Sequence, residues 1–247
     1  MARTELTKSA LASFFLLFGV FMSYAQEVET SADVYRLPCT GPDMQKERAR
    51  KRLIDPSHPV ARHLGPLKFR IPWAYIHPRP FSTHLNCDPD RSSVGIQYWI
   101  PDLQAPERDL WFRPEFSPAE TGRPNPGPDE SAIKVTAIKY YGPGYELGES
   151  TVDQMIKGSL RLYDDPELRE EYGLTLIRGE GALRWFAQSD KEDLFIFCAD
   201  PLGRICQGEL QLKDWKLQAH FIFLRSAVPH HASITEGMRT LLERWKY

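Results

Sequence analysis

The sequence predicts an α+β fold in which antiparallel sheets pack against helices. Apolar residues alternate along several short segments, two other segments place them at helical spacing, and the connections between the later strands are short. Short connections favour antiparallel neighbours. The order of strands, helix, strands and helix also admits two similar sheet-plus-helix halves, although no internal repeat marks them.

The first half of the chain contains two clear candidate strands. Leu67–Ile71 alternates apolar with basic residues, Val94–Ile100 alternates apolar with mixed residues, and each segment stops at a proline. The residues expected on one face of the second strand are Val94, Ile96, Tyr98 and Ile100. A short charged helix is expected over Asp43–Leu53, with its charges in solvent.

The second half begins with a strand over Ile133–Tyr141. A helix follows from a cap at Ser150 or Thr151 to about Tyr163, and an acidic stretch from Asp164 forms its exit. Four or five strands then form a meander, over Leu174–Ile177, Leu183–Phe186, Leu194–Cys198, Ile205–Leu212 and Leu217–Leu224. The closing segment, Thr235–Lys246, carries an apolar stripe typical of a helix that packs on a sheet.

Residues 1–25 have the layout of a secretory signal. Arg3 and Lys8 precede an apolar run, Ala10–Met22, and cleavage is expected after Ala25. The run has 13 residues, whereas a membrane-spanning helix needs roughly 20, so no stable membrane anchor is expected. Removing 25 of 247 residues leaves 222, which we divide into an N-terminal half, 26–130, and a C-terminal half, 131–247.

The net charge argues against nucleic acid as a partner. The precursor has a formal charge of −2, and because the signal contributes two basic residues and one acidic residue, the mature chain carries about −3. The hydrophobic content of 42% argues against disorder.

All four cysteines lie after the signal, and an even number in an exported chain indicates disulfides. We favour the pairs Cys39–Cys87 and Cys198–Cys206, since two strands joined by a turn would bring the second pair within bridging distance. The alternative is metal ligation by His77, His84 and Cys87, but their spacing matches no zinc pattern. No metal site is therefore expected.

A long segment between the halves is the strongest candidate for a functional loop. Residues 101–128 contain seven prolines, which excludes a regular helix or a central strand. Structureless loops of this length are uncommon and are usually functional or disordered. Aromatic and arginine side chains gather there, and disorder alone does not need them: Trp111, Phe112 and Phe116, with Arg108, Arg113 and Arg123.

The motifs of common secreted enzymes are absent from the sequence. It has no G-x-S-x-G elbow, no H-E-x-x-H helix and no glycine-rich phosphate loop. His230-His231 and the paired carboxylates Asp164 and Asp165 could serve catalysis, but an exposed turn and an acidic loop are the simpler interpretations. We therefore expect a binding protein, not an enzyme, with no cofactor.

Several stretches resemble a loose group of exported proteobacterial proteins. Phe69–Ile76 matches an F-x-I-P-x-x-Y-I element, and Tyr98–Leu103 matches the apolar-P-D element that follows it. Cys206, the strand Leu217–Leu224 and the closing helix resemble the group's C-terminal pattern. Members are similar to periplasmic immunity proteins of type VI secretion lipase and phospholipase effectors. The resemblance implies a periplasmic inhibitor that binds a secreted toxin and blocks its active site.

An inhibitor of this kind needs a partner-binding surface of about 800 Å² or more with aromatic and arginine anchors. The candidate anchors are Trp111, Phe112, Arg113 and Phe116, and the candidate carboxylates for a basic pocket of the toxin are Asp164, Asp165 and Glu167. Alternatively, the aromatics cover the sheet and the acids solvate a turn. The alternative functions are a periplasmic hydrolase with an unfamiliar acid or histidine site, and an envelope ligand-binding domain.

Overall fold

The structure is a computed structural model that describes residues 35, 39, 46, 49–85, 87–110, 123, 126–143, 151–162, 166–179, 181–199 and 203–247. The expected signal peptide lies outside these residues. Among the described residues, no helix is long and apolar enough to cross a membrane.

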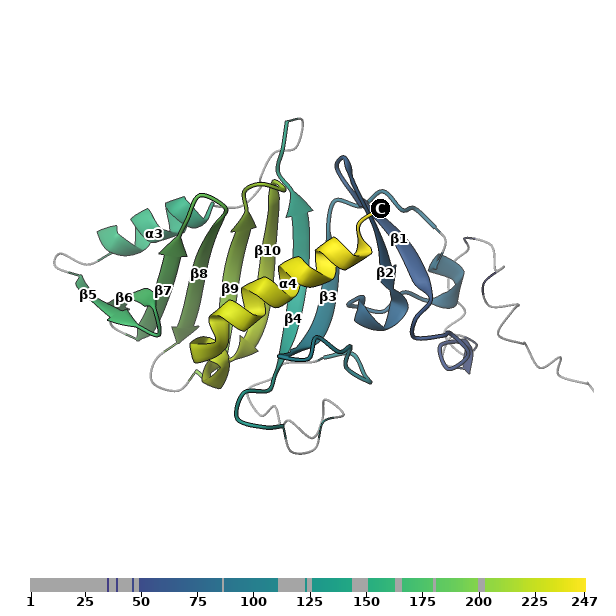
Figure 1. Cartoon of the computed structure of the whole chain (residues 1–247), viewed down its shortest axis with the longest axis horizontal. Helices are drawn as coiled ribbons and strands as arrows, with labels where there is room; N and C mark the ends of the chain where they lie inside the picture. Colours follow the sequence, from purple (N-terminus) through teal and green to yellow (C-terminus); the bar gives the residue numbers. More distant parts are fainter. Residues whose placement is uncertain are drawn as a thin grey trace, which may run out of the picture.

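One eight-stranded antiparallel sheet dominates the fold, in the order β3-β4-β10-β9-β8-β7-β6-β5 (Figure 1). Its strands are β3 (Val94–Ile100), β4 (Ser131–Tyr140), β5 (Glu167–Glu171), β6 (Leu174–Gly179), β7 (Ala182–Gln188), β8 (Glu192–Ala199), β9 (Ile205–Leu212) and β10 (Leu217–Leu224). A separate hairpin pairs β1 (Pro59–Leu64) with β2 (Leu67–Pro72). The expected meander is confirmed, and the mainly antiparallel, helix-covered architecture agrees with the α+β class.

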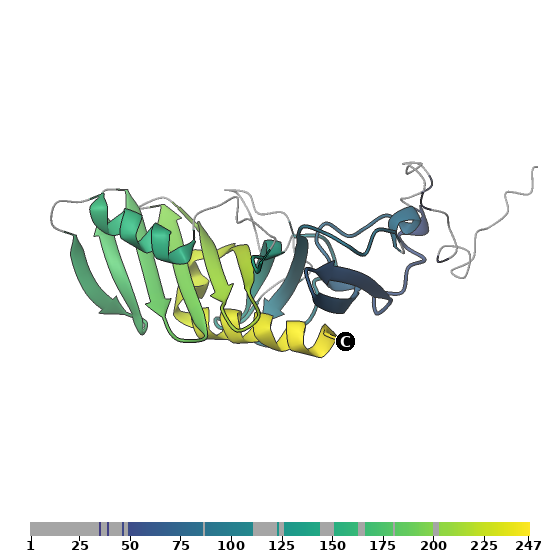
Figure 2. The ribbon, with the colours of Figure 1, turned by 90° about the horizontal axis from the view of Figure 1, so that it is seen from above.

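Two helices lie on opposite faces of this sheet. Figure 2 shows α3 (Val152–Arg161) on one side and α4 (His231–Trp245) on the other. Thr151 caps α3 with a reciprocal capping box to Gln154. From β4, which lies next to the edge strand β3, the chain passes through α3 before it reaches β5 at the opposite edge of the sheet, where the return meander begins. Because of this crossover, β5 lies far from β4 in the sheet instead of beside it.

The core lies mainly under α4, which crosses the sheet diagonally from the region of β8 and β9 to the β1–β2 hairpin (Figure 1). The large apolar side chains that it buries form the stripe that the sequence predicts: Ile234, Met238, Leu241, Leu242 and Trp245. The helix begins at His231, earlier than expected from the apolar pattern, because the short 3-10 helix η4 (Arg225–His230) leads directly into it.

Strand β3 is buried on both faces, since all seven of its residues are buried and not only the four expected on one face. On the second face, Trp99 packs with Leu110 and Ala132. Gln97 accepts a hydrogen bond from the backbone N–H of Leu110 at 2.9 Å. Gly95 lies against the chain after the 3-10 helix η1 (Trp73–Tyr75), where a Cβ atom would approach the His77 carbonyl oxygen to 2.1 Å. Leu110, from the described start of the Pro-rich segment, thus helps to cover the second face of β3.

Two strands were not expected from the sequence. Strand β1 carries Pro59, Arg62 and His63 among its apolar residues, and β5 reads Glu-Leu-Arg-Glu-Glu. Both are held by tight hairpins. Tyr172 and Gly173 join β5 to β6 with φ angles of 57° and 75°, and two positive φ angles are typical of the two-residue turn that matches strand twist.

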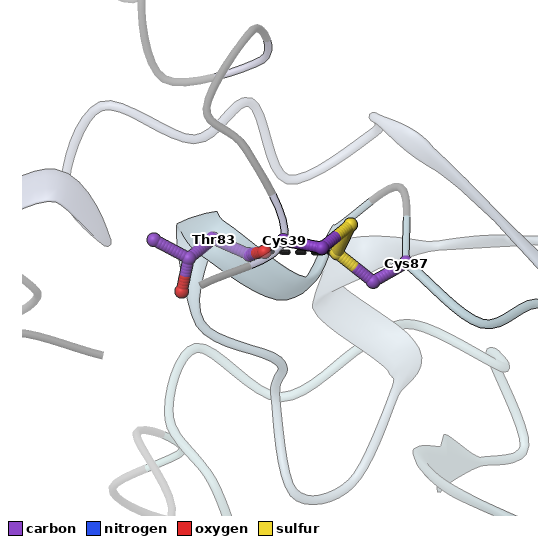
Figure 3. Close-up of a disulfide and its surroundings, with 3 residues drawn as sticks. All are labelled: Cys39, Thr83 and Cys87. Atoms are coloured by element: carbon purple, nitrogen blue, oxygen red, sulfur yellow. Dashed lines mark hydrogen bonds between the residues drawn. A yellow bond between two sulfur atoms is a disulfide. The ribbon is translucent and has the colours of Figure 1, made fainter. Parts of the chain in front are cut away.

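Both expected disulfides are present. Cys39 is bonded to Cys87 with Cα atoms 5.8 Å apart, and Cys198 is bonded to Cys206 with Cα atoms 4.4 Å apart. The second pair joins residues that face each other directly on β8 and β9. Figure 3 shows the first pair, where Cys87 Sγ lies 2.9 Å from the carbonyl oxygen of Thr83. The disulfide ties Cys39 to Cys87, which precedes β3 in the chain.

A test of the core concerns the Tyr98 hydroxyl, which donates to the Ile234 carbonyl oxygen at 2.7 Å in a fully buried site. We expect Tyr98→Phe to lower the free energy of unfolding by about 1 to 2 kcal/mol, because a buried hydrogen bond is lost without a replacement. Urea unfolding measures this value. The control is Tyr172→Phe, whose side chain is 51% exposed and should change little; equal losses in both variants would contradict the prediction.

Candidate partner-binding surface

The β5 edge of the sheet is the described surface best suited to contact another protein. In the described part of the chain, β5 pairs with β6 on one side and with no strand on the other. Its outward backbone N–H and C=O groups are therefore available to an added strand. Four of its five residues are exposed and the fifth is intermediate.

Apolar side chains gather beside this edge. Leu168 on β5 is 53% exposed and Tyr172 in the β5–β6 turn is 51% exposed. Leu162, which follows α3 and precedes β5 in the chain, is 63% exposed, and Tyr247, at the C-terminus, is 52% exposed. Exposed apolar groups next to unpaired backbone are costly in water and are typical of a surface that becomes covered.

The charges of the edge are mostly carboxylates. Glu170 accepts a hydrogen bond from Thr175 at 2.9 Å. Glu171 contacts Arg169 at 3.4 Å and accepts the indole N–H of Trp185 at 2.7 Å. Trp185 is only 2% exposed, so this bond fixes the end of β5 against the core.

The predicted site residues fall partly on this edge. Glu167 is the first residue of β5 and is exposed, opposite Arg178 on β6. Asp164 and Asp165, like Trp111, Phe112, Arg113 and Phe116, lie outside the described residues. The roles of these residues stay predictions. The sequence analysis did not identify the apolar residues of the edge, Leu168 and Tyr172. The signal that could have indicated them is a leucine inside a charged run, shortly before a turn.

Contacts hold the described residues at both ends of the Pro-rich segment. At the first end, Arg79 donates to the carbonyl oxygens of Pro106 and Glu107 and lies 3.6 Å from Asp109. At the second end, Arg123 pairs with Asp102 at 2.5 Å and with Glu130 at 2.9 Å. Its guanidinium lies over the Trp99 ring, 4.5 Å from the centroid.

The histidines of the alternative hydrolase interpretation, His230 and His231, lie where η4 leads into α4. His230 Nε2 lies 3.6 Å from Asp129 Oδ1. His231, the first residue of α4, lines a small cavity of about 150 Å³ that also contains Glu192. Burial lowers the pKa of His231 below its usual value. His231 is therefore a neutral imidazole at neutral pH.

Metal ligation by His77, His84 and Cys87 is not compatible with the disulfide, because a bonded sulfur offers no thiolate. His77 is buried, and burial lowers its pKa, with the charge of Lys134 acting in the same direction. Among the described residues, no group of three or more His, Cys, Asp or Glu side chains is placed to hold a metal ion.

Among proteins of known structure, one aligns with this chain over most of its length. No protein-family model matches the chain, and no curated protein sequence matches it. An immunity protein of the Stenotrophomonas maltophilia type IV secretion system aligns with 14% identity and a TM-score of 0.47, covering 77% of this chain and 94% of that chain. A TM-score below 0.5 does not establish a shared fold, so the alignment assigns neither fold nor function here.

Three histidines predict a pH dependence of stability. The pKa values of His58, His77 and His231 are lowered in the folded state, chiefly by burial, whereas an unfolded histidine titrates near about 6.5. As the pH falls through this value, the unfolded chain binds protons that the folded chain does not. Stability is therefore complete above about pH 6.5 and declines below it.

Urea unfolding at pH 7.5, 6.5 and 5.5 measures this decline. We expect the stability of His231→Gln to decline less between pH 7.5 and 5.5 than that of the unsubstituted protein, since one of the three groups has been removed. Parallel pH profiles for the two proteins would show that His231 does not contribute.

Proposed function

We propose that this protein is an immunity protein that binds and inhibits a secreted toxin in the periplasm. The observation that carries the proposal is the unpaired β5 edge with its exposed apolar and acidic side chains. The export signal supports the location, and two disulfides suit an oxidising compartment. The resemblance of Phe69–Ile76 and Tyr98–Leu103 to exported immunity proteins supports the kind of partner.

The finer proposal is that the partner is a type VI secretion effector of the lipase class, with a phospholipase favoured. It rests on the sequence resemblance and on charge. A pocket that binds a phospholipid headgroup is electropositive, and carboxylates are suited to meet it. The β5 edge offers Glu167 and Glu170, and the preceding segment supplies Asp164 and Asp165.

We assign the aromatic anchors to the Pro-rich segment. Leu110 donates its backbone N–H to Gln97 of β3, and the Arg123 guanidinium lies over the ring of Trp99 of β3, so described residues on both sides of the anchors are held against this strand. A segment held in this way loses less conformational freedom on binding than a free loop of the same length. Trp111, Phe112, Arg113 and Phe116 would then act as binding anchors.

Co-purification from the periplasm tests the proposed function directly. The tagged protein should retain a secreted hydrolase, most directly one encoded beside its own gene, and should suppress release of fatty acid from phospholipid vesicles by that hydrolase at equimolar ratio. If the neighbouring gene encodes no secreted hydrolase and the periplasm yields none, the proposal fails. Retention of a toxin without phospholipase activity would keep immunity and reject the lipase class.

The anchor assignment predicts that Trp111→Ala or Arg113→Ala weakens toxin binding by about 2 kcal/mol or more, roughly 30-fold in Kd. Isothermal titration calorimetry with the purified toxin gives both constants. The matched control is Trp215→Phe, since Trp215 packs partly buried beside Phe69 in the core and away from the segment. Unchanged constants for both alanine variants would remove the segment from the interface.

The β5 edge is tested separately by Tyr172→Asn. Asparagine tolerates the positive φ angle of this turn, so the hairpin is kept while the exposed ring is removed. We expect at least about tenfold weaker toxin binding if the ring is covered in the complex. The matched control is Tyr247→Ala, an equally exposed tyrosine at the other end of the molecule; equal effects of the two changes would exclude a specific role for the edge.

A further inference from the structure

A cavity of about 240 Å³ lies beside the β5 edge, on the face of the sheet that α4 covers farther along. It is lined by residues of β5, β6, β7 and η4, together with the β5–β6 turn: Arg169, Glu171, Tyr172, Arg178, Leu183, Trp185, Arg225 and Val228. The strand register explains the grouping. Arg169 pairs with Leu176, which pairs with Trp185, and Arg178 pairs with Leu183, so these side chains share one face.

The cavity has an excess of positive charge. Three guanidinium groups and one carboxylate line it, which gives a net charge of +2. Glu171 uses both oxygens within the protein, because Oε1 contacts Arg169 and Oε2 accepts the Trp185 indole N–H. No hydrogen bond or ion pair to Arg178 is found within the described part of the chain, although Glu167 lies opposite it in the strand register.

The base of the cavity is formed by apolar side chains that are almost fully buried. Leu183 is 7% exposed, and Trp185 and Val228 are each 2% exposed, so the surface open to a ligand is mainly polar. The buried base excludes water from one side of the guanidinium groups, which strengthens the attraction of these groups for an anion.

We propose that this cavity binds a small organic molecule through an oxyanion, a phosphate or a carboxylate, held by Arg178 and Arg169. A guanidinium presents two parallel N–H donors that match the oxygens of either group. Glu171 is a positioning residue, since it orients Arg169 and ties the site to Trp185. Arg169 and Glu171 also belong to β5, so the cavity and the β5 edge share residues, and ligand binding is measured without the toxin.

The Trp185 indole N–H gives a direct readout, because it donates to Glu171 at the base of the cavity. In a ¹⁵N-labelled sample of the full mature protein, the indole signals of the tryptophans are assigned and followed during titration. The probes are inorganic phosphate, glycerol 3-phosphate and succinate. Glycerol and sodium chloride at matched ionic strength serve as the neutral and non-specific controls.

We expect saturable movement of the Trp185 signal with at least one anionic probe and none with glycerol or chloride. Arg178→Gln should weaken that binding at least tenfold. The matched control is Arg161→Gln at the exposed end of α3, which should leave it unchanged. A response to phosphate probes alone assigns the phosphate class, and a response to succinate alone assigns carboxylates; either result supports the site.

The proposal is overturned if no anionic probe moves the Trp185 signal, or if chloride moves it equally. It is also overturned if Arg178→Gln and Arg161→Gln weaken binding to the same extent, because this would indicate general charge attraction. Unchanged dispersion of the remaining indole signals confirms that each variant is folded. Since none of these measurements involves the toxin, the outcome is separate from that of the immunity proposal.

Discussion

The hydrogen bond from Tyr98 to the Ile234 carbonyl oxygen, 2.7 Å long and fully buried, joins the two parts on which the rest of the structure depends. One is β3, the edge strand next to the hairpin, and the other is the start of α4. Burial raises the pKa of Tyr98, so its hydroxyl keeps the proton that it donates. Farther along α4, Trp245 contacts the Tyr75 ring edge-on at 4.9 Å. The helix thus holds the hairpin, β3 and the meander in one body.

The packing of α4 explains the residues of the two segments that carry the family resemblance, Phe69–Ile76 and Tyr98–Leu103. Phe69 and Ile71 are fully buried, and the Tyr75 hydroxyl donates to the Leu103 carbonyl oxygen at 2.9 Å. These side chains join β2, the turn after β3 and α4, so they serve the fold. The residues that carry the resemblance therefore belong to the core, apart from the β5 edge.

The sequence predicted those elements whose apolar pattern reports their surroundings. Strand β3, the meander and the stripe of α4 follow from alternation or helical spacing alone. The alternation did not predict that both faces of β3 are buried, because Gln97 and Trp99 are buried by partners distant in the chain. Strand β5 was missed for the opposite reason: an exposed edge strand needs no apolar face, and its charged sequence resembles a loop. The proposed division at residue 130 stays a prediction, although β3 and β4, from either side of it, are paired.

The same geometry determines which face of the sheet α4 leaves uncovered. Because α4 runs from the middle of the sheet toward the hairpin (Figure 1), the described residues that border the face of β5, β6 and β7 come from η4. Polar residues on that face, Arg169 and Arg178, remain in contact with solvent, while Trp185 beneath them is buried. A helix extended over these strands would fill the cavity that these arginines line. The length and direction of α4 thus stabilise one end of the molecule and leave the β5 edge and this cavity uncovered by the helix.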